Sequence, residues 1–262
     1  MLPLSADAFP QSSAALAAAL ERGFAQHGIV MRDVTVTGEG FPAIDELAID
    51  LTGASLSRNF RVPGTRSLGE AVRVESLRIA GNPVRFENTP VTLQFAASQA
   101  VFEMGGEPGN GSLNLAEARD GTVLLSVSKD ALEALLHEYA SRLAASKGIE
   151  IATTQVRFAS HGPRSLSFVA EVTAKVFVMT AAVTLSGNLD LDDRLTARVS
   201  GLRLGGDGMV TRLAGSYVQP QLDKIEGRTF PLLAFSPAGL KLRDVEISAG
   251  DVLEIKAVFG SA

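Results

Sequence analysis

The sequence predicts an α+β fold in which long antiparallel strands outnumber the helices, and three observations support this prediction. Apolar residues occupy every even position from Leu166 to Val178, which gives one apolar face to an unusually long strand. Two other stretches repeat apolar residues every three or four positions, as amphipathic helices do. Breaks rich in glycine and proline divide the remaining chain into apolar segments. Strands usually have only five or six residues, so a strand of this length indicates extended, curved sheets.

The first helix is expected to begin at Ser12 or Ser13, either of which can cap it, and to end near Gln26 before Gly28. Its apolar stripe consists of Leu16, Leu20 and Phe24. Eight strands should follow, at Ile29–Thr37, Glu46–Thr52, Val72–Gly81, Val84–Phe86, Val91–Phe95, Ala100–Met104, Ser112–Ala116 and Thr122–Val127. The glycine-rich break at residues 105–111 predicts a flexible hairpin end or a mobile loop.

A second helix is expected from Ser128 or Asp130 to about Lys147. Four strands should follow it, at Ile149–Phe158, Leu166–Lys175, Phe177–Ser186 and Leu195–Leu204, with turns at residues 162–163, 187–188 and 192–193. The apolar alternation shifts at Gly201, which predicts a β-bulge. A third helix from about Asp207 to Ile225, bending or breaking at Pro220, precedes three final apolar stretches, Thr229–Leu233, Leu240–Ile247 and Val252–Phe259.

The order of these elements predicts two similar halves, each with a helix and a sheet, at residues 1–127 and 128–262. The alternative is one continuous domain, which a chain of 262 residues can also form.

Composition excludes several classes of function. The net charge of −5 argues against nucleic acid as a partner, and the absence of cysteine excludes thiol chemistry and disulfides. The start of the chain has no basic segment, and its apolar run at residues 14–20 is short and followed by charges. We therefore expect a soluble chain without signal peptide or membrane span, either cytoplasmic or, if a leader was removed, periplasmic.

Sequence motifs predict no catalytic residue, metal or cofactor. The three histidines lie in different elements, and neither the zinc-hydrolase motif nor the serine-hydrolase motif is present. The acidic stretch at residues 188–193 lacks the glycine of a calcium loop and is better explained as a hairpin tip. The sequence therefore predicts a protein that is not an enzyme.

One basic segment is a candidate site for an anionic head group. Six arginines lie between Leu51 and Phe86, against two glutamates, and the candidates among them are Arg58, Arg61 and Arg66. A solvated strand edge and loop is the simpler alternative.

Three stretches carry a resemblance to a known family. They are Val34–Pro42 leading into Leu47–Gly53, the Ser128–Gly148 helix with the four strands after it, and Val199–Gly208 with its helix and the last three apolar stretches. In pattern and order the chain resembles the bacterial LmeA-like family of phospholipid-binding proteins, which are related in shape to the tubular lipid-binding superfamily. The resemblance implies curved antiparallel sheets wrapped around helices, with an apolar groove that holds lipid chains.

We therefore expect non-catalytic binding, and transfer, of a phospholipid or another acyl lipid, with transient membrane contact. The candidate lining residues are Phe168, Val172, Val176 and Val178 on the sheet, with Leu136, Tyr139 and Leu143 on the helix opposite. The competing hypothesis is a structural or protein-interaction module with a dry core, which binds its partner through strand edges.

Overall fold

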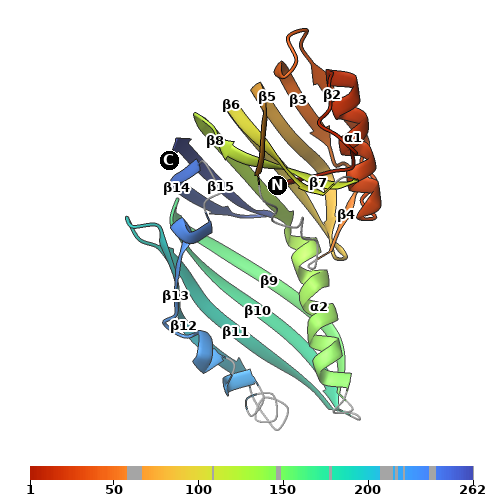
Figure 1. Cartoon of the computed structure of the whole chain (residues 1–262). Helices are drawn as coiled ribbons and strands as arrows, with labels where there is room; N and C mark the ends of the chain where they lie inside the picture. The colour runs from red at the N-terminus through yellow and green to blue at the C-terminus, as the bar shows by residue number, and fades with distance from the viewer. Residues whose placement is uncertain are drawn as a thin grey trace. The chain divides into compact units, whose positions relative to one another are not determined.

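The computed structural model describes residues 1–57, 67–107, 109–145, 149–176, 179–206, 215, 218–220, 222–235 and 240–261. The fold is α+β, with two sheets and far more strand than helix (Figure 1). The chain divides into two compact units. The first contains Met1–Ser126, Phe235–Asp244 and Lys256–Ala262, and the second contains Val127–Ala234 and Val245–Ile255.

The larger sheet has ten strands. Its order is β14-β15-β8-β6-β5-β3-β2, while β4 pairs with β5, and β7 pairs with β6 and β1. The strands are β1 (Leu2–Leu4), β2 (Asp33–Thr37), β3 (Ala43–Asp50), β4 (Ser55–Leu56), β5 (Ser67–Phe86), β6 (Thr89–Glu107), β7 (Asn110–Glu117), β8 (Asp120–Ser128), β14 (Leu240–Ala249) and β15 (Val252–Ser261). The β3 and β4 strands run parallel to β5. The expectation of purely antiparallel sheets was therefore wrong for this sheet.

Helix α1 (Ser13–Gln26) packs tightly in the first unit, and its predicted bounds are confirmed. The Ser12 side chain accepts a hydrogen bond from the Ala15 N–H, and Gly28 follows with a φ of 72°. A Cβ added at Gly23 would lie 2.5 Å from the Pro3 carbonyl oxygen, so β1 passes directly against the helix. The predicted stripe, Leu16, Leu20 and Phe24, is buried.

Several predicted boundaries in the first unit were wrong. Residues 29–32 form no strand, and β2 begins only at Asp33. The segments predicted on either side of Asn82-Pro83 form one strand, β5, with a register shift there, and two further predicted segments join into β6. The glycine-rich break is shorter than expected, because β6 continues to Glu107 and β7 begins at Asn110. The β1 and β4 strands were not predicted.

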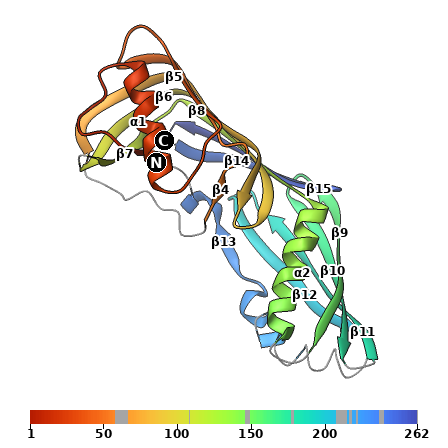
Figure 2. The ribbon, with the colours of Figure 1, turned by 90° about the vertical axis from the view of Figure 1, so that its right-hand side faces the viewer.

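The second unit contains an antiparallel five-stranded sheet, in the order β13-β12-β11-β10-β9. Its strands are β9 (Glu150–Gly162), β10 (Ser165–Val176), β11 (Met179–Leu191), β12 (Thr196–Gly206) and β13 (Thr229–Pro231), followed by a short 3-10 helix, Leu232–Phe235. Helix α2 (Lys129–Ala145) runs alongside β9 in both views (Figures 1 and 2). The four long strands after α2 are therefore confirmed, and only the last predicted stretch before residue 236 is shorter than expected.

The bulge at Gly201 is also confirmed. The register between β11 and β12 shifts between Ser186 and Asn188, and Gly201 has a φ of 65°. The predicted turn at residues 187–188 is wrong, because both residues lie inside β11. Of the predicted third helix, residues 218–220 and 222–225 are helical, and most of residues 207–217 lie outside the described part of the chain.

Candidate functional site: an apolar sheet face

One face of the five-stranded sheet is almost entirely apolar. Directly paired residues of antiparallel strands point to the same side, so the strand register determines which residues share this face. We call this set the apolar face, and it comprises Ile151, Thr154, Val156, Phe158, Ser160, Leu166, Phe168, Ala170, Val172, Ala174, Ala181, Val183, Leu185, Gly187, Leu189, Val199 and Leu204. Its polar members are Thr154 and Ser160, both on β9.

The opposite face of the same strands is polar. On β10 it presents Ser165, Ser167, Glu171 and Lys175, with Val169 among them. The Ser165 hydroxyl donates to Asp190 Oδ1 at 2.6 Å, and Arg157 pairs with Glu171 at 3.1 Å. The sheet therefore has one polar face and one apolar face, as the alternation of its sequence predicted.

The apolar face is incompletely covered. Some of its residues, such as Val156, Ala170 and Ala174, are buried. Phe168, Val172 and most of its side chains on β11 are only half-buried. A closed core normally leaves no such exposure on its central strands. A large apolar surface thus remains in contact with solvent.

Phe168 lies flat on this face instead of projecting from it. A Cβ placed on Gly187 would be 2.8 Å from the Phe168 ring and 2.7 Å from Leu202 Cδ2. The absence of a side chain at Gly187 therefore provides the space for the aromatic ring. This is the physical reason for a glycine in the middle of β11, where the sequence had suggested a turn.

Helix α2 is held at the β9 border of the sheet by two polar contacts. Glu133 Oε1 accepts a hydrogen bond from the backbone N–H of Val156 at 2.8 Å, and His137 Nδ1 lies 3.4 Å from Thr154 Oγ1. Lys129 Nζ is 3.8 Å from Glu133 Oε1. The helix begins as predicted, because the Ser128 hydroxyl accepts from the Ala131 N–H at 3.2 Å.

The rest of α2 carries an exposed apolar stripe. Leu135, Tyr139 and Leu143 are spaced four residues apart and are 39%, 59% and 55% exposed. Leu136 is half-buried and lies between this stripe and the residues that contact β9, and Ala131 is the buried residue of the helix. A helix with so little burial is not held by core packing alone.

The opposite border of the sheet is held by a second glutamate. The Glu226 carboxylate accepts from the N–H groups of Gly201 at 3.0 Å and of Leu202 at 2.7 Å, at the bulge in β12. A Cβ at Gly215 would lie 3.7 Å from Leu204 Cδ2, so Gly215 lies at this edge of the apolar face. Neither glutamate carries a sequence signal for this role, and both were missed.

The structure places the predicted lining residues as follows. Phe168 and Val172 lie on the apolar face, and Leu136, Tyr139 and Leu143 lie on α2 beside it. The backbone of Val176 pairs with Met179 at the end of β10, but its side chain is outside the described part of the structure, as is Val178. The head-group candidates Arg58, Arg61 and Arg66 also lie outside the described residues.

One chemically notable contact was missed in the sequence. His161 Nε2 lies 2.9 Å from Ser167 Oγ, a pairing of base and hydroxyl. Both residues lie near the β9–β10 turn, and no carboxylate among the described residues pairs with His161 to orient it. Within the described ranges, no group of three His, Cys, Asp or Glu residues is arranged to hold a metal ion.

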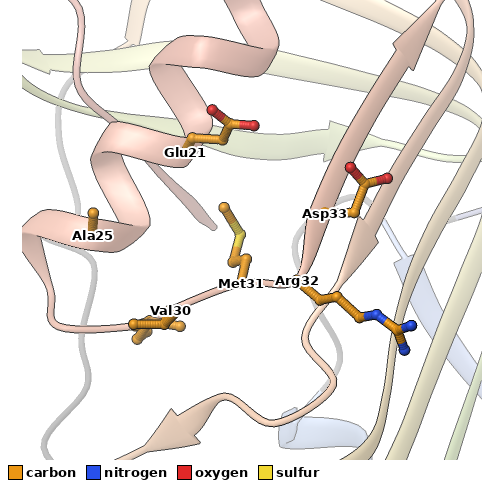
Figure 3. A pocket seen from close by; sticks show the side chains of 7 residues that line it. Glu21, Ala25, Val30, Met31, Arg32 and Asp33 are labelled. Atoms are coloured by element: carbon orange, nitrogen blue, oxygen red, sulfur yellow. The ribbon is translucent and has the colours of Figure 1, made fainter.

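Two surface pockets belong to the first unit. One, of about 270 Å³, lies between α1 and the start of β2, where Met31 extends toward the helix and Arg32 points away (Figure 3). The other, of about 560 Å³, is lined mainly by residues of β3, β5 and β6, with Asp45, Arg73, Glu75 and Gln99 among apolar neighbours such as Ile44. Their mixed linings differ from the continuous apolar face of the second unit.

Comparisons with known proteins give little further information. No protein-family profile matches the chain, and no curated protein matches it. A solved structure described as the crystal structure of lipopolysaccharide binding protein is similar over 65% of this chain and 54% of that chain, with 13% identity and a TM-score of 0.24. The chain thus spans about half of that protein. At this TM-score the likeness has no weight for the fold or function of this chain.

A membrane-spanning helix is not among the described elements, because none of these helices is both long and apolar enough.

Proposed function

We propose that the second unit binds the acyl chains of a lipid along the apolar face, between α2 on one side and Gly215 and Glu226 on the other, and leaves the lipid chemically unchanged. The observation that supports this proposal is the incomplete burial of Phe168, Val172 and Leu185 on a face that is predominantly apolar across four strands. This is the arrangement implied by the resemblance to the LmeA-like and tubular lipid-binding proteins.

The dimensions and energetics of the face suit an acyl chain. The 12 residues of β10 span roughly 40 Å at about 3.3 Å per residue. The acyl chains of one leaflet span only about 15 Å, half of a bilayer core of about 30 Å. Each methylene removed from water contributes about 0.8 kcal/mol, so one long chain supplies on the order of 10 kcal/mol before entropic costs.

The character of the face also limits where a head group can lie. The apolar face contains no charged residue, and its two polar members are already engaged. Thr154 Oγ1 lies 3.4 Å from His137 Nδ1, and the Ser160 hydroxyl donates to the Gly162 carbonyl. A phosphate or carboxylate would lose its hydration there without gaining a partner. The head group is therefore expected beyond the ends of the strands, in water.

The competing function, partner binding through strand edges, has weaker support. The Val156 N–H on β9 is already bonded to Glu133, and the Gly201 and Leu202 N–H groups on β12 are bonded to Glu226. The Gly227 N–H also donates to the Val199 carbonyl at 2.9 Å. These contacts occupy part of the backbone positions at which an added strand would pair.

The proposal is tested by substituting neighbouring residues that point to opposite faces of β10. Val172→Asp places a charge on the apolar face, whereas Val169→Asp places one on the polar face, where Val169 is already 36% exposed. Organic extracts of the purified wild-type protein, analysed by mass spectrometry, should contain stoichiometric lipid. A fluorescent fatty acid should bind Val172→Asp at least about tenfold more weakly, because the acyl chain meets a desolvated carboxylate.

The polar face of β10 provides the control for this experiment. Val169→Asp should retain wild-type affinity, and circular dichroism should show that both variants are folded. A folded Val172→Asp protein that binds the probe as the wild type does, or a wild-type protein without lipid and without affinity for the probe, would contradict the proposal. Ser167→Ala should change neither binding nor the integrity of added ester lipids, because the ligand is not hydrolysed.

A further inference from the structure

The outer border of the five-stranded sheet carries an exposed segment, residues 224–234, which we call the edge strap. It contains β13 and most of the following 3-10 helix, drawn in blue in Figure 1. Every residue in it is exposed except Leu232, which is half-buried. Its large apolar side chains, Ile225, Phe230 and Leu233, are 38%, 38% and 45% exposed.

The backbone of the edge strap is fixed to the sheet. The Gly227 N–H donates to the Val199 carbonyl at 2.9 Å, and the Leu232 N–H donates to the Leu195 carbonyl at 2.9 Å. The Glu226 carboxylate adds its two bonds to β12. The exposed apolar side chains are therefore presented on an ordered backbone and are not the result of a frayed end.

Three cationic side chains lie along the same border, Arg194 and Arg228 outside the strands and Arg198 on the polar side of β12. Arg194, Arg198 and Arg228 are exposed and form no ion pair with any residue in the described part of the chain. The neighbouring acids, in contrast, are engaged. Asp192 Oδ1 accepts from the N–H groups of Arg194 and Thr196, and Asp193 pairs with Arg164 at 3.0 Å.

The edge strap is continuous with the apolar face. Phe230 pairs with Ala197, and Ala197 pairs with Leu191. Since these pairs share one side of the sheet, Phe230 extends the row of apolar side chains that leads to Val199 and Leu189. A hydrocarbon chain moving along this row would meet no charged side chain between the edge strap and β11.

We propose that the edge strap is the surface that docks this protein on an anionic lipid bilayer. Basic side chains beside exposed apolar ones match a membrane surface, where the cations meet anionic head groups and the apolar groups enter the interface. An acidic protein would match the arginines but not the three exposed apolar side chains. The inference rests on the proposed lipid binding, and it gives that function a point of exchange with the bilayer.

The test is flotation of the full-length protein with vesicles of phosphatidylglycerol and phosphatidylcholine, compared with vesicles of phosphatidylcholine alone. The wild type should float with the anionic vesicles, and added salt should release it. Arg194→Glu/Arg228→Glu should weaken partitioning at least about 25-fold, since each cation near an anionic surface contributes about fivefold. Phe230→Ser/Leu233→Ser should weaken it at least about tenfold through the loss of apolar burial.

A matched control changes similar residues elsewhere. Val30→Ser/Arg85→Glu replaces an exposed valine and an exposed arginine of the first unit, and it should float as the wild type does. The inference is overturned if the wild type does not float, if it floats equally with uncharged vesicles, or if the edge-strap variants float as the control does. It is also overturned if the edge strap binds an acidic protein while ignoring vesicles.

Measuring the lipid content of the same preparations separates this inference from the proposed function. Edge-strap variants that still contain lipid but do not float support docking as a distinct step. A wild-type protein that floats but never contains lipid would support docking and overturn the proposed function instead.

Discussion

The first unit holds the most completely buried large apolar side chains of the described residues, whereas the apolar face of the second unit leaves comparable side chains partly exposed. The largest residues that are less than 2% exposed, among them Leu16, Leu47 and Leu113, all belong to the first unit. In the second unit, the exposed large apolar residues include Tyr139, Leu143 and Leu233. Similar side chains can therefore serve two purposes, and only their packing distinguishes a core from a binding surface.

The largest expected effect comes from shortening one leucine in each unit to alanine. Leu47 in β3 is fully buried, and Leu185 on the apolar face is half-buried. Leu47→Ala should lower the free energy of unfolding by about 2–5 kcal/mol, because it leaves a cavity. Leu185→Ala should lower it by about 1 kcal/mol or less, because less apolar area is lost from a partly hydrated site. Urea unfolding monitored by circular dichroism measures both, and equal losses would remove the distinction between the units.

An intermediate effect tests whether the apolar face is loosely packed throughout. Gly187→Ala should lower the free energy of unfolding by about 1–3 kcal/mol, because the added methyl meets the Phe168 ring and Leu202. Phe168→Ala in the same protein should reduce that penalty, since it removes one of the two contacts, and a double-mutant cycle measures the coupling. A neutral Gly187→Ala variant would show that the ring moves freely across the face.

The smallest effect concerns a polar contact on the surface of the first unit. Ser98 Oγ donates to Asp120 Oδ1 at 2.7 Å, and this bond, assisted by Arg119, holds the pKa of Asp120 below its ordinary value. A carboxyl with a lowered pKa stabilises the fold at neutral pH, and this contribution is lost as the pH falls through the folded-state pKa.

Ser98→Ala should therefore raise the pKa of Asp120 and make stability less sensitive to acid below about pH 4, by about 0.5 kcal/mol or less. Nuclear magnetic resonance titration of the Asp120 carboxyl measures the change directly. An unchanged pKa in Ser98→Ala would assign the lowering to Arg119 instead.

Local signals in the sequence were sufficient for α1, α2 and the alternation of β10. Ser12 and Ser128 cap α1 and α2 as predicted, because a cap depends on residues only three positions apart. Pairings between distant segments were missed. The β1 strand pairs with β7 through Leu2 and Leu113, and neither sequence carries a mark of its partner. Gly187 was misread for the same reason, since its role depends on Phe168 in the neighbouring strand.

The candidate site was predictable only in part. Alternation and helical spacing placed Val172 on the apolar face of β10 and Tyr139 on α2, but could not show how far either is exposed. Phe230 and Leu233 illustrate the difficulty, because in sequence an exposed apolar residue looks the same as a core residue. Exposure depends on what the rest of the chain covers, which is a property of the whole fold.

The bulge at Gly201 bears on how the protein resists aggregation. Consecutive N–H groups of a regular strand point in opposite directions, but those of Gly201 and Leu202 both reach the Glu226 carboxylate. Glu133 occupies the Val156 N–H at the far side of the sheet. A sheet with a large exposed apolar face and open strand edges is otherwise prone to aggregate into fibrils through strand pairing between molecules. These two carboxylates occupy backbone N–H groups near both borders of the sheet, so an added strand would find fewer hydrogen-bonding partners there while the apolar face stays open.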